Sequence, residues 1–263
     1  MPERAGTEVQ WFPGHMARAL RRLAEDVKIS DVVIEVVDAR VPRSGRNPAL
    51  AEIAGRKPRV TVLTREDLAD PQATAAWLDV LRGDAAAAIA MNGKRQGSVA
   101  RLKAALAETV PPMRRPARVL VVGIPNAGKS TVINALARKN VARVEDRAGV
   151  TRAPQWFRAS TSLEVLDTAG VLPPKIDGTD GQWMLALCGA VPRARFDAEE
   201  VVGRFLAWTK ERGIAVTDLA TFAQERGFVR RGNILDTHNA AWSYIKDWSD
   251  GRFGRMTLEL PPP

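Results

Sequence analysis

The feature that most constrains this fold is a glycine-rich segment at residues 123–131, which reads GIPNAGKST. It follows an apolar run at 119–122 and precedes residues 132–137, whose apolar positions have helical spacing. This order of strand, glycine-rich loop and helix is the context in which a GxxxxGK[ST] pattern forms a phosphate-binding loop. The segment therefore predicts a site for a nucleoside triphosphate.

Each fixed position of this loop has a chemical role. Gly123 and Gly128 leave room for backbone N–H groups to face phosphate oxygens. Lys129 can bridge the outer phosphates, Ser130 can ligate Mg²⁺, and the helix N-terminus adds its dipole. The residues of the loop predicted to hold the nucleotide are Asn126, Ala127, Gly128, Lys129, Ser130 and Thr131.

The rest of the chain alternates short apolar runs with helical patterns. Strands are expected at residues 31–38, 59–63, 85–91, 119–122, 155–158 and 162–166, and helices near 16–27, 71–81, 99–106 and 132–137. This alternation predicts an α/β fold with a mostly parallel sheet and helices on both faces. Ligand loops are then expected at the carboxyl ends of the strands.

Two further segments complete a triphosphate site. Asp167 ends a predicted strand and begins DTAG, where its carboxylate can reach Mg²⁺ through water and the N–H of Gly170 can approach the γ-phosphate. Thr151, in the loop between, can add its hydroxyl to the Mg²⁺ shell when that loop closes over triphosphate. We therefore expect Ser130, Thr151 and Asp167 to hold the metal.

A base-reading loop is missing where it is usually found. Guanine is normally read by an Asn-Lys-x-Asp loop after a buried strand, and none follows DTAG. The best candidate lies upstream, where Thr64 and Arg65 precede Asp67, which can accept from guanine N1–H and the 2-amino group. Asn92 and Gly93, after the next strand, can support the base. The strands that read the base would then precede the phosphate-loop strand.

Composition narrows the choice of partner and compartment. The formal net charge is +9, and residues 111–158 hold ten basic side chains against two acidic ones. This excess is compatible with a polyanionic partner or with an ordinary solvated surface. The single cysteine excludes an intrachain disulfide, and neither a signal peptide nor a membrane-spanning run is present. A cytoplasmic protein without membrane association is expected.

With its rotated order of motifs, the sequence resembles the circularly permuted ribosome-assembly GTPases, and most closely the ribosome biogenesis GTPase A family. The resemblance covers almost the whole chain. The segments that carry it are WFPGHM at 11–16, DARVP at 38–42, the phosphate loop, GVTR at 149–152, DTAG at 167–170, RRG at 230–232 and GRFGRMTLE at 251–259.

The resemblance implies a circularly permuted P-loop GTPase domain at residues 1–178 and a small all-α RNA-binding domain at 179–263. It implies hydrolysis of GTP to GDP, slow alone and stimulated by the ribosome. The protein would bind the precursor of the large ribosomal subunit and its rRNA in the GTP state and leave after hydrolysis. It would be a monomer off the ribosome. In relatives, the asparagine at position 126 is associated with a potassium ion that assists hydrolysis.

Three sets of residues depend on this resemblance. Val171-Leu172 stands where a water-orienting glutamine is usual, so His15 becomes a candidate for that role, with an ordinary turn histidine as the alternative. Thr64 and Arg65 replace the family's Asn and Lys, which weakens the contact to guanine N7 but leaves Arg65 able to stack on the base. The predicted rRNA contacts are Arg230, Arg231, Arg252 and Arg255, beside glycines.

Two alternatives stay open at this point. A P-loop ATPase or small-substrate kinase is compatible with the altered Thr64-Arg65 pair. A non-hydrolysing, nucleotide-gated scaffold that binds the ribosome is the other alternative, although intact Lys129, Ser130, Thr151 and Asp167 count against it.

Overall fold

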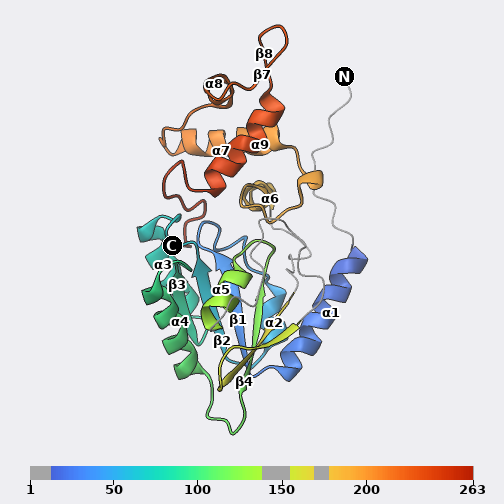
Figure 1. Ribbon diagram of the computed structural model, residues 1–263, viewed down its shortest axis with the longest axis vertical. Coiled ribbons are helices and arrows are strands. Elements are labelled where there is room, and N and C mark those ends of the chain that lie inside the picture. Colours follow the sequence, from blue (N-terminus) through green and yellow to red (C-terminus); the bar gives the residue numbers. More distant parts are fainter. Residues whose placement is uncertain (1–12, 138–154, 169–177, 263) are drawn as a thin grey trace. The chain divides into compact units, whose positions relative to one another are not determined.

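The computed structural model describes residues 13–137, 155–168 and 178–262 (Figure 1). These residues form two compact units. The first, the sheet unit, contains residues 13–137, 155–168 and 255–262, and the second, the helical unit, contains residues 178–254. None of the helices in the described ranges is long and apolar enough to cross a membrane.

The sheet unit is built on six strands in the order β3-β2-β1-β4-β6-β5. Five are parallel, and β5 pairs with β6 in the antiparallel direction. The strands that carry the base-reading candidates precede the phosphate-loop strand β4, so the permuted order expected from the sequence is confirmed. Their bounds are β1 Val32–Asp38, β2 Arg59–Thr64, β3 Ala87–Met91, β4 Ala117–Gly123, β5 Gln155–Arg158 and β6 Leu163–Asp167.

The direction of chain travel explains why helices cover both faces of this sheet. The chain moves from β1 to β3 in one direction and then returns past β1 to β4, and right-handed crossovers place helices on opposite faces for these two directions. One face carries α1 Pro13–Ile29, α2 Ala49–Ala54 and α3 Pro71–Arg82. The other carries α4 Gln96–Thr109 and α5 Lys129–Leu136.

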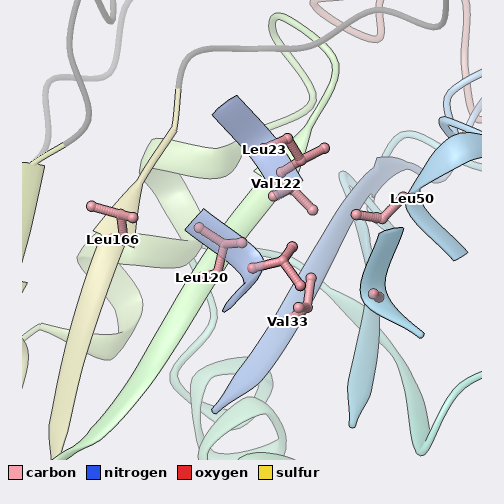
Figure 2. Packing of buried hydrophobic residues seen from close by; sticks show 8 residues of the cluster. Leu23, Val33, Leu50, Leu120, Val122 and Leu166 are labelled. Atoms are coloured by element: carbon pink, nitrogen blue, oxygen red, sulfur yellow. The ribbon is translucent and has the colours of Figure 1, made fainter. Parts of the chain in front are cut away.

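The packing on the first face follows the alternation of side chains along each strand. Figure 2 shows Leu23 of α1 and Leu50 of α2 beside Val33, Leu120 and Val122 of the central strands. All five are buried almost completely. Farther along the same face, Trp77 and Leu81 of α3 pack on Val37 and Leu63. The central strands are buried on both faces and hold the carboxyl ends of β1, β2 and β4 in fixed positions.

The helical unit contains four α-helices, one 3₁₀ turn and a two-stranded hairpin among its described residues. Its core is aromatic: Phe205, Tyr244 and Trp248 are buried, and Phe205 meets each of the other two rings edge-on at 6.2 Å. Ile245, one turn of α9 before Trp248, is buried as well. The bounds are α6 Gly178–Leu187, η1 Arg193–Arg195, α7 Ala198–Glu211, α8 Leu219–Glu225, β7 Val229–Arg230, β8 Ile234–Leu235 and α9 Thr237–Ser249.

The hairpin and the C-terminal tail differ from the division expected from the sequence. The short strands β7 and β8 stand in a region expected to be purely helical. The tail, assigned to the second domain from the sequence, packs on the sheet unit. There the N–H of Met256 donates to the carbonyl of Leu68 at 2.9 Å and that of Leu258 to the carbonyl of Arg40 at 2.8 Å. Buried Met256 and Leu258 give the tail its apolar contact with this unit.

Candidate functional site

Parallel pairing brings the predicted site residues to one edge of the sheet. Asp38 pairs with Thr64 at the ends of β1 and β2, and Val36 pairs with Gly123 at the end of β4. The loops that follow these strands therefore emerge side by side, as ligand-binding loops do in parallel sheets.

The phosphate loop has the geometry that its sequence predicts. Asn126 has a φ of 58° and Gly128 a φ of 94°, so the chain turns through left-handed conformations before α5 begins at Lys129. The buried Lys129 ammonium donates to the carbonyls of Gly123 at 3.3 Å and Ile124 at 3.0 Å. The Lys129 ammonium thus lies across the loop at the N-terminus of α5. A cation beside the N–H groups of a helix N-terminus is an arrangement that binds anionic phosphate.

The two glycines of the loop have different reasons for being glycine. A Cβ at Gly123 would lie 2.3 Å from the carbonyl oxygen of Val36 on the neighbouring strand. The glycine is therefore required by strand packing, in addition to the phosphate access expected from the sequence. At Gly128 the positive φ is the requirement, and a Cβ there would also lie 3.2–3.3 Å from Thr64.

Thr64 and Arg65 hold the phosphate loop. The Thr64 hydroxyl lies 2.5 Å from the carbonyl of Ala127 and 3.1 Å from that of Val37, and it is buried. Arg65, with a φ of 56°, donates from Nη2 to the carbonyl of Asn126 at 3.1 Å. In this structure the Arg65 guanidinium, expected to stack on the base, is directed to the phosphate loop.

Beneath Arg65 lies a buried ion pair whose role the sequence did not reveal. Arg40, 1% exposed, donates from Nε to Oδ1 of Asp38 at 3.0 Å and from Nη2 to Oδ2 at 2.8 Å. Arg65 approaches the same carboxylate at 3.4 Å. Burial alone would raise the pKa of Asp38. The guanidinium groups of Arg40 and Arg65 together have the larger, opposite effect, so the pKa of this carboxyl is lowered from 3.8. Both residues belong to the DARVP motif at 38–42, and this motif was the one feature of the sequence that pointed to them.

Asp67 is the one acidic side chain of the loop after β2 that has no hydrogen-bond or ion-pair partner among the described residues. Its neighbour Glu66 accepts from the N–H of Asn92 at 3.1 Å, the hydroxyl of Ser98 at 2.9 Å and Nη2 of Arg101 at 3.1 Å. The half-buried Asp67 carboxylate is thus presented by a fixed loop and is available to a ligand.

The loop after β3 joins the same site. The Asn92 side chain is buried, and its Oδ1 accepts from the N–H of Lys94 at 2.9 Å. A Cβ at Gly93 would lie only 2.1 Å from Cγ2 of Thr131, so this glycine permits contact with the helix of the phosphate loop. Asn92 and Gly93 therefore connect the base-reading and phosphate-binding parts.

Four predicted residues are described only in part or not at all. Thr151 and Gly170 lie outside the described residues, while His15 and Asp167 have described backbone positions in α1 and β6. Ser130, in the first turn of α5, has no side-chain hydrogen-bond partner among the described residues. Among those residues no group of His, Cys, Asp and Glu forms a metal cluster. A Mg²⁺ site here would depend on hydroxyl and phosphate oxygens, which suits that ion.

The four arginines predicted to contact rRNA have different surroundings. Arg230 donates to Oδ1 of Asp236 at 2.6 Å, and Arg252 pairs with Asp247 at 3.2 Å. Arg255 donates to backbone carbonyls in the sheet unit. Arg231, exposed at the tip of the β7–β8 hairpin, has no partner among the described residues.

Comparisons with known proteins agree on one family. A family model described as "50S ribosome-binding GTPase" matches residues 118–226. The chain is 41% identical to ribosome biogenesis GTPase A of Priestia megaterium over 96% of this chain and 97% of the relative, and 36% identical to that of Bacillus cereus over 96% and 94%. The crystal structure of GNP-bound YlqF from T. maritima superposes with a TM-score of 0.73, at 28% identity, covering 93% of this chain and 98% of that one.

Proposed function

The chain belongs to the ribosome biogenesis GTPase A family and is a GTP-hydrolysing ribosome-assembly factor, and we propose that it acts on the precursor of the large subunit. It binds rRNA of this precursor in the GTP state and leaves after hydrolysis. The observation that carries the proposal is the partner-free carboxylate of Asp67 at the same sheet edge as a complete phosphate loop. The relatives favour neither an ATP-using enzyme nor a non-hydrolysing scaffold.

Base selection rests on Asp67. Its two oxygens can accept from N1–H and the 2-amino group of guanine, whereas adenine presents an acceptor at N1 and no 2-amino group. Thr64 and Arg65 support this selection indirectly, because they hold the carbonyls of Ala127 and Asn126 and so fix the phosphates relative to the base.

Hydrolysis rests on positioning and charge. When the phosphates enter, the Lys129 ammonium exchanges the carbonyls of Gly123 and Ile124 for phosphate oxygens. There it stabilises the negative charge of the transferring phosphoryl group, together with backbone N–H groups of the loop and of Gly170. His15 is proposed to position the attacking water. Since Val171 and Leu172 cannot do so, turnover is slow until the ribosome contributes.

The hydroxyl of Ser130 fits a role as a magnesium ligand, since it begins α5 without a described protein partner. Thr151 and Asp167 are proposed to complete the protein's share of this site. Mg²⁺ would supply charge neutralisation at the β- and γ-phosphate oxygens. The side-chain oxygen of Asn126 is proposed to bind K⁺.

The rRNA contact is proposed to centre on the hairpin of the helical unit. Arg231 is exposed at its tip, and Arg230 is exposed beside it, held by Asp236. Arg230, Arg252 and Arg255 are all engaged by protein acceptors, so they are weaker candidates than Arg231. The net charge of +9 favours attraction to rRNA phosphates. We propose that the protein is cytoplasmic and monomeric away from the ribosome.

The test of this function begins with nucleotide binding in the presence of Mg²⁺, comparing GDP, GTP and ATP. A clear guanine preference is expected, followed by GTP turnover that rises when large subunits are added. Equal binding of ATP would overturn the assignment of Asp67. A GTP turnover rate that does not change when large subunits are added would overturn the proposed action on the large-subunit precursor.

The rRNA contact is tested separately by charge reversal at the hairpin. Arg231→Glu is expected to weaken binding to large subunits and to reduce its salt dependence. Arg204→Glu is the matched control, because Arg204 is exposed in the same unit and forms an ion pair with Glu200 one helical turn away. Equal loss in both variants would indicate a general charge effect and not a hairpin contact.

A further inference from the structure

Residues 255–259, which we call the C-terminal strap, cross the loop that carries Asp67. We propose that this strap is part of the base-recognition site and that Arg255 is a positioning residue for guanine selection. The inference rests on the proposed function, because it assumes that Asp67 reads the base. None of the strap residues is assigned to the phosphates.

Arg255 contacts the loop on both sides of Asp67. Its Nε donates to the carbonyl of Ala69 at 2.8 Å, and its Nη2 donates to the carbonyl of Glu66 at 2.7 Å. The planar guanidinium thus fixes the distance between two carbonyls that bracket the carboxylate. No other side chain among the described residues donates to either of these carbonyls.

The next two strap residues continue these contacts along the loop. The N–H of Met256 donates to the carbonyl of Leu68 at 2.9 Å, and the hydroxyl of Thr257 accepts from the N–H of Asp70 at 3.1 Å. Each residue from Leu68 to Asp70 is therefore bonded to the strap. Within the loop itself, the N–H of Leu68 closes a turn on the carbonyl of Arg65 at 2.9 Å. The strap thus bonds to every residue of this part of the loop, while the first turn of α3 bonds to Asp70 alone, through Ala73 and Thr74.

The far end of the strap is anchored in the same unit. The Glu259 carboxylate, 5% exposed, accepts from the N–H of Arg43 at 2.7 Å, the N–H of Ser44 at 3.0 Å and the hydroxyl of Ser44 at 2.5 Å. Its carbonyl accepts from Nε1 of Trp77 at 2.8 Å. Because this anchor does not involve the nucleotide loops, it gives Arg255 a fixed point from which to position them.

This arrangement bears on base selection because a carboxylate distinguishes guanine only if its two oxygens meet N1–H and the 2-amino group together. Recognition of this kind requires the side chain to be held within roughly 0.5 Å of its bonding geometry. The loop from Glu66 to Asp70 has no regular secondary structure to hold it. Removing Arg255 frees two carbonyls and allows Asp67 to move away from that geometry, while the contacts of Lys129 stay unchanged.

The experiment compares the affinities for GDP and IDP, which differ only in the 2-amino group. The wild type is expected to prefer GDP by about tenfold or more, the value of a hydrogen bond to a charged group. In Arg255→Ala this ratio is expected to fall toward one, with GDP losing more affinity than IDP, because inosine keeps N1–H but has no 2-amino group to lose. Arg255→Lys keeps a donor and is expected to restore part of the ratio. Arg82→Ala, which removes an exposed ion pair with Asp79, is the control.

The outcomes separate this inference from the function on which it rests. If the wild type prefers GDP, Asp67→Ala abolishes the preference and Arg255→Ala retains it, the strap has no role in selection and the proposed function stands. If the wild type binds GDP and IDP equally, the reading of the base by Asp67 fails as well. Should Arg255→Ala not fold, Arg255→Gln decides by the same ratio, since glutamine cannot donate to both carbonyls in the guanidinium geometry.

Discussion

The phosphate loop and the base-recognition loop (residues 64–70) lie at the same edge of the sheet but are held in different ways. Lys129 bonds to carbonyls five and six residues away. Arg255 bonds to the base-recognition loop across 186 and 189 residues. Apart from its contacts with Thr64 and Arg65, the first loop is held by its own backbone conformation, and the second is held by side chains and strands from distant parts of the chain.

This difference implies that the two halves of the nucleotide site, the phosphate loop and the base-recognition loop, can lose their function independently of each other. Local contacts survive changes elsewhere, whereas the base-recognition loop depends on the buried Asp38–Arg40 pair, on β3 through Glu66 and on the strap. Thr64 and Arg65 are the points where the two halves meet. Variants can therefore be chosen to affect one half, the other, or the connection.

The largest effect is expected at the support of the base-recognition loop. Arg40→Ala leaves the Asp38 carboxylate buried without its main partner, and breaking a buried pair in this way costs about 3–5 kcal/mol. Urea unfolding at neutral pH measures the loss. Arg82→Ala, which breaks an exposed pair, is expected to cost less than about 1 kcal/mol. A comparable cost for both variants would contradict the importance of the buried pair.

The same pair predicts a dependence on pH. The pKa of Asp38 is lowered from 3.8 in the folded protein, so its contribution to wild-type stability is complete above that value and is lost as the pH falls through the folded pKa. In Arg40→Ala the carboxylate has lost its main source of lowering, so it binds a proton at higher pH. The penalty of the variant should therefore shrink as the solution is acidified.

The next largest effect isolates the phosphate half. Lys129→Ala removes the cation that stabilises the transferring phosphoryl group, and turnover of GTP is expected to fall about 10²–10³-fold. The ratio of GDP to IDP affinity should stay at the wild-type value, because Asp67 and its loop are unchanged. Single-turnover hydrolysis and binding titrations measure the two quantities. A collapse of the ratio in this variant would show that the halves are not independent.

A somewhat smaller effect isolates the base half. Asp67→Asn replaces a double acceptor with one acceptor and one donor, so affinity for GDP is expected to fall about ten- to a hundredfold. Xanthine carries a carbonyl where guanine carries the 2-amino group, and an asparagine amide can donate to it. The variant should therefore bind XDP better than the wild type does. Unchanged GDP affinity, or no gain for XDP, would remove Asp67 from the site.

The sequence predicted the parts of this molecule whose requirements are local. The phosphate loop follows from a fixed motif, and the buried strands follow from β-branched runs such as 31–38, so the order of strands along the chain and the site edge could be inferred. At Gly123 the structure adds a requirement that the motif does not show, since a Cβ there would lie 2.3 Å from the carbonyl oxygen of Val36. The six-residue helix α2 was missed because Pro48 before it gives no side-chain cap and its length shows less than two turns of periodicity.

The rest depended on contacts that leave no periodic pattern. Nothing in Gly-Arg-Phe-Gly-Arg indicates that Arg255 bonds to a loop 186 residues earlier, so this arginine was read as an exposed rRNA contact. From the sequence, Thr64 is expected only to weaken the contact to guanine N7. In the structure its hydroxyl donates to the carbonyl of Ala127 in the phosphate loop. Long-range hydrogen bonds of this kind depend on the tertiary fold, which a reading of local patterns cannot supply.

The smallest effect tests the connection between the two halves. Thr64→Val keeps the buried shape but removes the hydroxyl that bonds to the carbonyls of Ala127 and Val37. Loss of such a bond costs on the order of 1 kcal/mol, or about fivefold in affinity. Because this hydroxyl sets the position of the phosphate loop and not the aim of Asp67, GDP and IDP should weaken together and their ratio should not change.

Thr64→Ser, which keeps a hydroxyl, is the matched control for this last variant and should bind both nucleotides nearly as the wild type does. The contrast with Arg255→Ala is then direct, because in that variant GDP is expected to lose more affinity than IDP, so that the ratio falls. If Thr64→Val also lowered the ratio, the hydroxyl would be positioning the base as well as the phosphates. The two loops would then act as one cooperative unit, and the independence argued from their different construction would be lost.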